Sequence, residues 1–141
     1  MITIHIYSVG KNKSSWLVEL INIYTQRLSS KYKIEWHLYK KEASLYQNIL
    51  PLKTWVYLTE KAPCTDSITF AKKFRSWIDT SGGQLHFVIG PDMGLDPQIA
   101  KKATHKLSLS PMTLTHQMVR AFFLEQLYRA DQIFAGTPYH K

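Results

Sequence analysis

The chain contains a single cysteine, Cys64, among its 141 residues. One thiol excludes an internal disulfide and every metal site that needs several thiolates. No stretch approaches the roughly 18–20 consecutive apolar residues that a membrane-spanning helix requires. The opening residues 1–10 lack a basic segment followed by an apolar core, so we expect no secretory signal. These absences favour a cytoplasmic protein without a membrane partner.

Acidic residues are also few, with 10 Asp and Glu against 18 Lys and Arg and a formal net charge of +8. This excess favours an anionic partner such as nucleic acid, because phosphate contacts release counterions. The basic residues form only short clusters, for example Lys11–Lys13 and Lys101–Lys102, and no arginine-rich arm is present. Any RNA binding is therefore expected to use a folded surface.

The sequence has no Gly/Ser-rich or Pro-rich linker and no internal repeat. Its hydrophobic fraction of 45% and charged fraction of 20% are typical of a globular protein. The length fits one hydrophobic core. We therefore expect a single domain spanning residues 1–141.

Hydrophobic periodicity predicts strands and helices in alternation. Alternating or continuous apolar residues predict strands at 2–6, 34–38, 54–58, 85–89 and 107–109. Apolar residues at three- and four-residue spacing predict helices at 15–28, 42–50, 67–78, 97–103 and 118–127. Asp66 and the pair Asp96-Pro97 are typical helix starts. Such alternation predicts an α/β fold with a mostly parallel sheet and helices on both faces.

Ligands of parallel sheets bind at loops beyond the carboxyl ends of the strands. This rule directs attention to the loops that follow Leu58, Ile89 and Leu109. The loop Gly90–Leu95 permits close approach of a ligand to the main chain, although a simple strand-to-helix turn remains the alternative. Residues 107–116 fit the wall of an adenine pocket or a loop packed on the core.

The tail Gly136–Lys141 is the third candidate segment. It places an aromatic ring, an imidazole and an ammonium group in three successive residues, Tyr139, His140 and Lys141. Together these groups suit base stacking, proton transfer and phosphate neutralisation. A frayed chain end is the alternative reading.

Four blocks of the sequence, taken in order and spacing, resemble one known family. They are Phe87–Leu95 (FVIGPDMGL), Leu107–Arg120 (LSLSPMTLTHQMVR), Glu125–Ala130 (EQLYRA) and Tyr139–Lys141 (YHK). The family is the ribosomal large-subunit pseudouridine N3-methyltransferases (RlmH), of the SPOUT superfamily, and the resemblance spans nearly the whole chain. It implies a C-terminal trefoil knot, a homodimer, and S-adenosylmethionine (SAM) as the methyl donor.

The resemblance also implies which residues bind the donor. Three loops would form its site, and the matching residues here are Leu58, Gly90, Leu109, Ser110, Pro111, Met112, Thr113 and Leu114. The substrate implied is N3 of a pseudouridine in 23S ribosomal RNA, on the assembled ribosome. This sequence departs from the family pattern at Pro91, Thr59 and Ala62.

We expect three residues to take part in the chemistry. His140 is the preferred proton acceptor, because imidazole titrates near neutral pH. Tyr139 would position the base, and Arg120 would hold a phosphate or the developing negative charge. His116 is the competing histidine.

We expect no metal in the reaction, since methyl transfer from SAM needs none. The other histidines are expected to be ordinary strand or surface residues. They are His5, His37, His86 and His105. Glu125 and Arg129, four residues apart, are expected to form a solvated pair.

Two other functions are left open by the sequence. One is a SPOUT methyltransferase that acts on another RNA. The second is a non-catalytic RNA-binding or ribosome assembly factor that has lost its donor site, and Pro91 and Thr59 are the residues that keep this alternative open.

Overall fold

The computed structural model describes residues 1–141 and contains one five-stranded parallel sheet. The strand order is β2-β1-β4-β3-β5. The strands are β1 (Ile2–Val9), β2 (Tyr32–Tyr39), β3 (Val56–Leu58), β4 (Gln84–Ile89) and β5 (His105–Leu107). All pairs are parallel, as predicted from the alternation of strands and helices.

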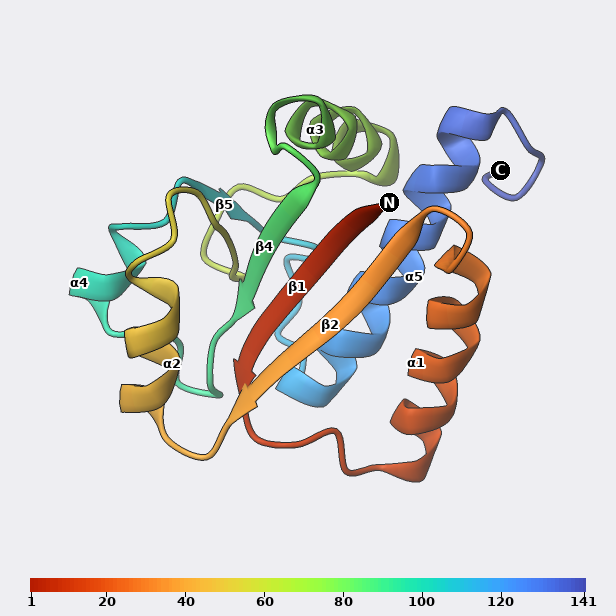
Figure 1. Cartoon of the computed structure of the whole chain (residues 1–141). Coiled ribbons are helices and arrows are strands. Elements are labelled where there is room, and N and C mark those ends of the chain that lie inside the picture. Colours follow the sequence, from red (N-terminus) through yellow and green to blue (C-terminus); the bar gives the residue numbers. More distant parts are fainter.

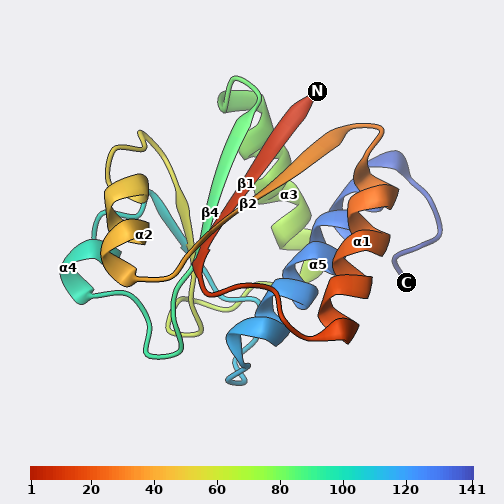
Figure 2. The same ribbon diagram turned by 60° about the horizontal axis from the view of Figure 1, so that its bottom comes forward.

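Helices cover both faces of the sheet (Figures 1 and 2). Three of them, α1 (Ser15–Leu28), α3 (Ser67–Thr80) and α5 (His116–Ala135), lie on one face. The shorter helices α2 (Glu42–Ile49) and α4 (Pro97–Ala100) lie on the other face. The predicted α/β architecture is therefore confirmed, while the trefoil knot that the resemblance implies stays a prediction.

Side chains of successive strand residues enter different cores, because they point to opposite faces of the sheet. Ile6 and Phe87 pack into the larger core beside α1, α3 and α5. Their neighbours Tyr7 and Val88 enter the smaller core beneath α2. Strand β4 is thus buried on both faces, as its continuous apolar sequence predicts.

Several predicted boundaries differ from the structure, and two of them bear on the loops at the carboxyl edge of the sheet. Helix α4 ends at Ala100 rather than near residue 103, because the chain must turn into β5, where the Thr104 N–H donates to Trp55 O at 2.9 Å. Strand β5 spans His105–Leu107 rather than residues 107–109, so Leu109 lies in the following loop. This shift places residues 108–115 beyond the carboxyl edge of the sheet.

Only part of the apolar face predicted for the last helix is buried. Phe123 and Leu127 are buried in the larger core. Met118 and Phe122 are 44% and 38% exposed. No helix is both long enough and apolar enough to cross a membrane.

Candidate functional site

A cavity of about 430 Å³ lies at the carboxyl ends of β3, β4 and β5. Its walls come from three loops that the strand order brings together: the loops after Leu58, after Ile89 and after Leu107. The Thr59 N–H donates to Leu107 O at 2.9 Å and joins the first loop to β5. Segments about 50 residues apart in sequence therefore form one pocket, at the edge of the sheet where ligands of such folds bind.

The loop Gly90–Leu95 is held in place by Tyr57 of β3. The buried Tyr57 hydroxyl accepts a hydrogen bond from the Leu95 N–H at 3.0 Å. A Cβ added at Gly90 would lie 3.3 Å from both Leu95 N and the Tyr57 hydroxyl oxygen. Gly94 has φ +80°, a conformation that side chains rarely adopt. Close packing therefore favours glycine at position 90, and the positive φ favours glycine at position 94.

The loop after β5 is ordered by its own serines. The buried Ser108 hydroxyl donates to Ser110 O at 2.8 Å, and the Ser110 hydroxyl accepts from the Met112 N–H at 3.0 Å. Thr115 then caps α5 by accepting from the Met118 N–H at 3.2 Å. Residues 108–115 belong to no strand or helix, and these side-chain hydrogen bonds hold their irregular backbone in place.

A polar contact joins the two loops at the mouth of the cavity. His116 Nδ1 lies 2.5 Å from Asp92 Oδ1. The hydrogen bond from His116 lowers the pKa of Asp92, so the carboxylate is charged at neutral pH. The competing histidine of the sequence therefore contributes to the cavity wall.

Seven of the eight residues predicted to bind the donor line this cavity. They are Leu58, Gly90, Leu109, Ser110, Met112, Thr113 and Leu114. The exception is Pro111, which is exposed and is not part of the cavity lining.

Arg120 does not lie where the sequence prediction placed it. Its side chain is wholly buried, and its guanidinium donates to Ser8 Oγ and to the carbonyls of Val9 and Gly10. A fourth bond, of 2.7 Å, reaches Asn12 Oδ1. In this conformation Arg120 is bonded within the protein and is not part of the cavity lining, and its role in the chemistry stays a prediction. The side chain joins α5 to the end of β1.

Tyr139 and His140 lie together, but against α5 and outside the cavity lining of the same chain. The Tyr139 hydroxyl donates to Glu125 Oε1 at 3.0 Å, and Arg129 Nη1 lies 3.0 Å from His140 Nδ1. Burial and the bond to Glu125 raise the pKa of Tyr139. Glu125 and Arg129 form the predicted i,i+4 pair, but their side chains are only 22% and 25% exposed, so the pair is partly buried rather than fully solvated. The pair anchors the C-terminal tail.

Sequence reasoning missed two residues that shape the cavity. Tyr57 was read only as part of a strand, although a buried tyrosine hydroxyl normally needs a partner and thereby signals a polar contact. Asp92 gave no signal, because its partner His116 is distant in sequence. Three lysines also line the cavity, together with the acidic residues Glu60 and Asp92: Lys61, Lys101 and Lys106.

Comparisons with known proteins agree with this geometry. The sequence model of a family described as "Predicted SPOUT methyltransferase" matches residues 2–140. Ribosomal RNA large subunit methyltransferase H of Synechococcus sp. (strain CC9311) is 37% identical, covering 96% of this chain and 94% of that protein. The protein of the same name from Christiangramia forsetii is 36% identical, with 98% of each chain covered.

Solved structures share the fold at low sequence identity. A probable methylase family protein from Haemophilus influenzae Rd KW20 gives a TM-score of 0.56 at 9% identity, covering 99% of this chain and 70% of that one. A probable methyltransferase from Bordetella pertussis Tohama I gives 0.56 at 12% identity, covering 91% of this chain and 95% of that one. The fold, the pocket at the sheet edge and the full-length sequence match lead to one conclusion: the chain belongs to the SPOUT methyltransferase family, whose methyl donor is SAM.

Proposed function

We propose that this protein transfers the methyl group of SAM to N3 of a pseudouridine in 23S ribosomal RNA. The observation that carries the proposal is the convergence of three loops on one cavity at the carboxyl edge of the sheet. The name "Ribosomal RNA large subunit methyltransferase H", carried by relatives of nearly equal length, supports RNA of the large subunit as the substrate.

The cavity residues suit an adenosyl group. The volume of about 430 Å³ falls in the usual range for pockets that bind small cofactors. Leu58, Leu109 and Leu114 provide apolar walls for a base, while the exposed backbone of residues 110–114 offers hydrogen-bonding groups for its edge. SAM, when bound, supplies a methyl group already activated by a sulfonium, so the protein must chiefly align it and exclude water.

The N3 proton of the base must be accepted by some group, and His140 is the candidate. In the conformation described, Arg129 donates to His140 Nδ1 at 3.0 Å and occupies its lone pair. For this nitrogen to act as a base, the tail must leave Arg129. Tyr139, which is bonded to Glu125, would move with it and position the substrate base.

The tail packs against the middle of α5 at Glu125, whereas the cavity lies at the start of this helix, at His116. Glu125 lies nine residues after His116, which corresponds to about 14 Å along a helix. We therefore propose a homodimer in which the tail of one chain completes the cavity of the other. Exposed apolar residues on α1 and α5, namely Trp16, Met118 and Phe122, support a partner surface here.

With a net charge of +8, the folded surface suits recognition of a preformed RNA surface by shape and phosphate contacts. We infer that the substrate is the assembled ribosome and that the protein works in the cytoplasm.

Two measurements test the proposal. Calorimetric titration should show one SAM bound per chain, and absence of binding at millimolar SAM would favour a non-catalytic assembly factor. In a strain lacking its own enzyme, expression of this chain should restore one N3-methylpseudouridine, detected by mass spectrometry of 23S RNA. Methylation of a different RNA would instead identify another SPOUT methyltransferase.

A further inference from the structure

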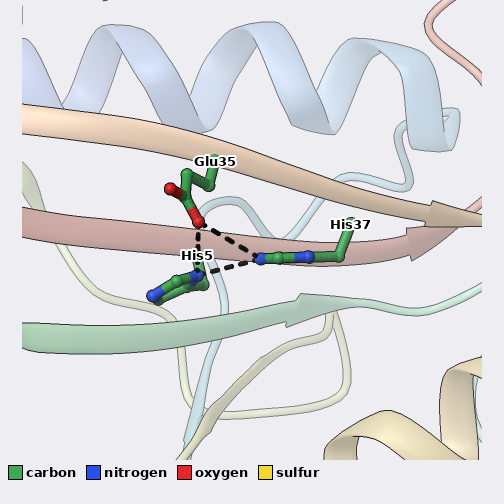
Figure 3. Close-up of side chains that lie close together, drawn as sticks. All are labelled: His5, Glu35 and His37. Atoms are coloured by element: carbon green, nitrogen blue, oxygen red, sulfur yellow. Dashed lines mark hydrogen bonds and ion pairs between the residues drawn. The ribbon is translucent and has the colours of Figure 1, made fainter.

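A cluster of polar side chains lies on the sheet face that carries α2 and α4. His5 of β1 and Glu35 and His37 of β2 belong to it (Figure 3). Ile4, on the opposite face, packs in the larger core, so the polar residue next to it must face away from that core. His5 is directly opposite Glu35 in the parallel register, and His37 follows two residues later on the same face.

The nitrogen and oxygen atoms of these side chains that could bind a metal ion face one another. His5 Nδ1 lies 2.9 Å from His37 Nε2 and 3.3 Å from Glu35 Oε2. His37 Nε2 lies 3.9 Å from the same carboxylate oxygen. In a tetrahedral zinc site with bonds of about 2.0–2.1 Å, neighbouring donor atoms are roughly 3.3 Å apart. The three observed separations bracket that value.

Neighbouring residues hold the side chains of His5 and Glu35 in their orientations. His5 Nε2 lies 2.7 Å from Gln84 Oε1, an oxygen that can only accept, so in the neutral imidazole this nitrogen carries the proton and Nδ1 presents a lone pair. Lys33 Nζ lies 2.9 Å from Glu35 Oε1 and leaves Oε2 directed at the histidines. Such outer contacts orient the ligands of metal sites.

The cluster has fewer N–H donors than acceptor atoms. When both imidazoles are neutral and His5 carries its proton on Nε2, the proton on His37 Nε2 is the only one available between two imidazole nitrogens and a carboxylate oxygen. Three electron-rich atoms therefore share at most one donor. A cation with an affinity for nitrogen ligands would satisfy all three.

We propose that His5, Glu35 and His37 bind a Zn²⁺ ion, with the fourth position open to solvent. Two imidazoles and a carboxylate suit zinc, whereas Mg²⁺ and Ca²⁺ prefer oxygen ligands alone. The side chains are 13%, 33% and 32% exposed, respectively, so an ion can enter from solvent. The ion would join β1 to β2, which is an edge strand of the sheet.

This zinc site is separate from methyl transfer. None of its residues lines the cavity at the carboxyl ends of β3, β4 and β5. Its expected effect is on the stability of the edge strand, because a ligand that binds only the folded chain stabilises it. SAM affinity should be the same with and without zinc.

Titration of the chelator-treated protein with zinc chloride tests the site. We expect one Zn²⁺ per chain and a higher melting temperature in its presence. His37→Gln and Glu35→Gln should each weaken binding by more than about 100-fold, and Gln84→Ala by about 10-fold. The matched control is His105→Gln, which changes an exposed histidine of β5 and should leave zinc affinity unchanged. Circular dichroism would show that each variant is folded.

NMR of the histidine side chains identifies the ligand atoms. Zinc should shift the ¹⁵N resonances of His5 Nδ1 and His37 Nε2, and those of His105 should stay in place. Binding that all four variants retain, or that needs millimolar zinc, would be adventitious and would overturn the proposal. The same holds if magnesium shifts the same resonances.

Discussion

Replacement of the buried Arg120 by methionine tests whether this residue stabilises the fold or serves the chemistry. Its guanidinium makes four hydrogen bonds of 2.7–3.1 Å, to Ser8, Val9, Gly10 and Asn12. No carboxylate pairs with it, and burial lowers its pKa to about 10. The guanidinium is therefore still charged at neutral pH and is stabilised only by neutral acceptors.

The expected loss follows from these bonds. Hydrogen bonds to a charged group contribute about 1.5–3 kcal/mol each. Methionine fills similar space and removes the cost of burying a charge, but it leaves the Val9 and Gly10 carbonyls without this donor. We expect a net loss of about 1–3 kcal/mol, the usual cost of leaving buried acceptors unpaired. Native proteins are stable by only about 5–15 kcal/mol, so this loss is large.

Urea unfolding followed by circular dichroism measures this loss. Arg75→Met is the matched control, because Arg75 is 62% exposed and its ion pair with Asp79 is expected to contribute under about 1 kcal/mol. Arg120→Lys keeps the charge with fewer bonds and should fall between the two. An Arg120→Met protein that unfolds at the wild-type urea concentration yet transfers no methyl group would refute the structural role.

Three further predictions concern the cavity, a helix start and the tail. Gly90→Ala should raise the Kd for SAM roughly 10-fold in calorimetry, because the new Cβ would lie 3.3 Å from Leu95 N and displace the loop at a cost of about 1–2 kcal/mol; an unchanged Kd would contradict this. The Thr69 N–H lowers the pKa of Asp66, so the cap is stabilising above the unfolded pKa and is lost as the pH falls through the folded pKa. The melting temperature of Asp66→Ala should therefore be lower than that of the wild type at pH 7, and the difference should shrink below about pH 4; a difference independent of pH would show that the carboxylate is not the cap. His140→Ala should lower turnover and leave SAM affinity unchanged; equal loss of both would mean that the tail is structural.

Local sequence patterns predicted most of the helices and strands, because such a pattern needs no information from residues distant in the sequence. Ile2, Ile4 and Ile6 alternate along β1, and Asp66 begins α3 with the predicted side-chain cap. The three loops of the cavity also followed from a general rule, since parallel strands bring their carboxyl ends to one edge. For these features, neighbours in sequence hold the necessary information.

The features that sequence reasoning missed depend on contacts between distant residues. His5 and His37 are separated by 31 residues and meet only because β1 and β2 pair in this register. Arg120 occupies a helix position whose neighbours Ala121 and Phe123 are buried, yet its charge suggested a surface role. The carbonyls that accept its hydrogen bonds belong to Val9 and Gly10, at the end of β1 and 111 and 110 positions away in the sequence. Spacing along the chain contains none of this information.

The contacts that hold the donor cavity differ in strength from those that hold the tail. The cavity loop is held by the Tyr57 hydroxyl, which is buried, so breaking its bond to Leu95 would leave polar groups unpaired at a cost of about 1–3 kcal/mol. The tail is held by Glu125 and Arg129, whose side chains retain access to water and can exchange partners with it. Water can replace such contacts, so breaking them leaves no polar group unpaired, unlike the bond of Tyr57. A rigid site for the donor and a tail whose contacts water can replace are the combination that a proton acceptor delivered by the C-terminus requires.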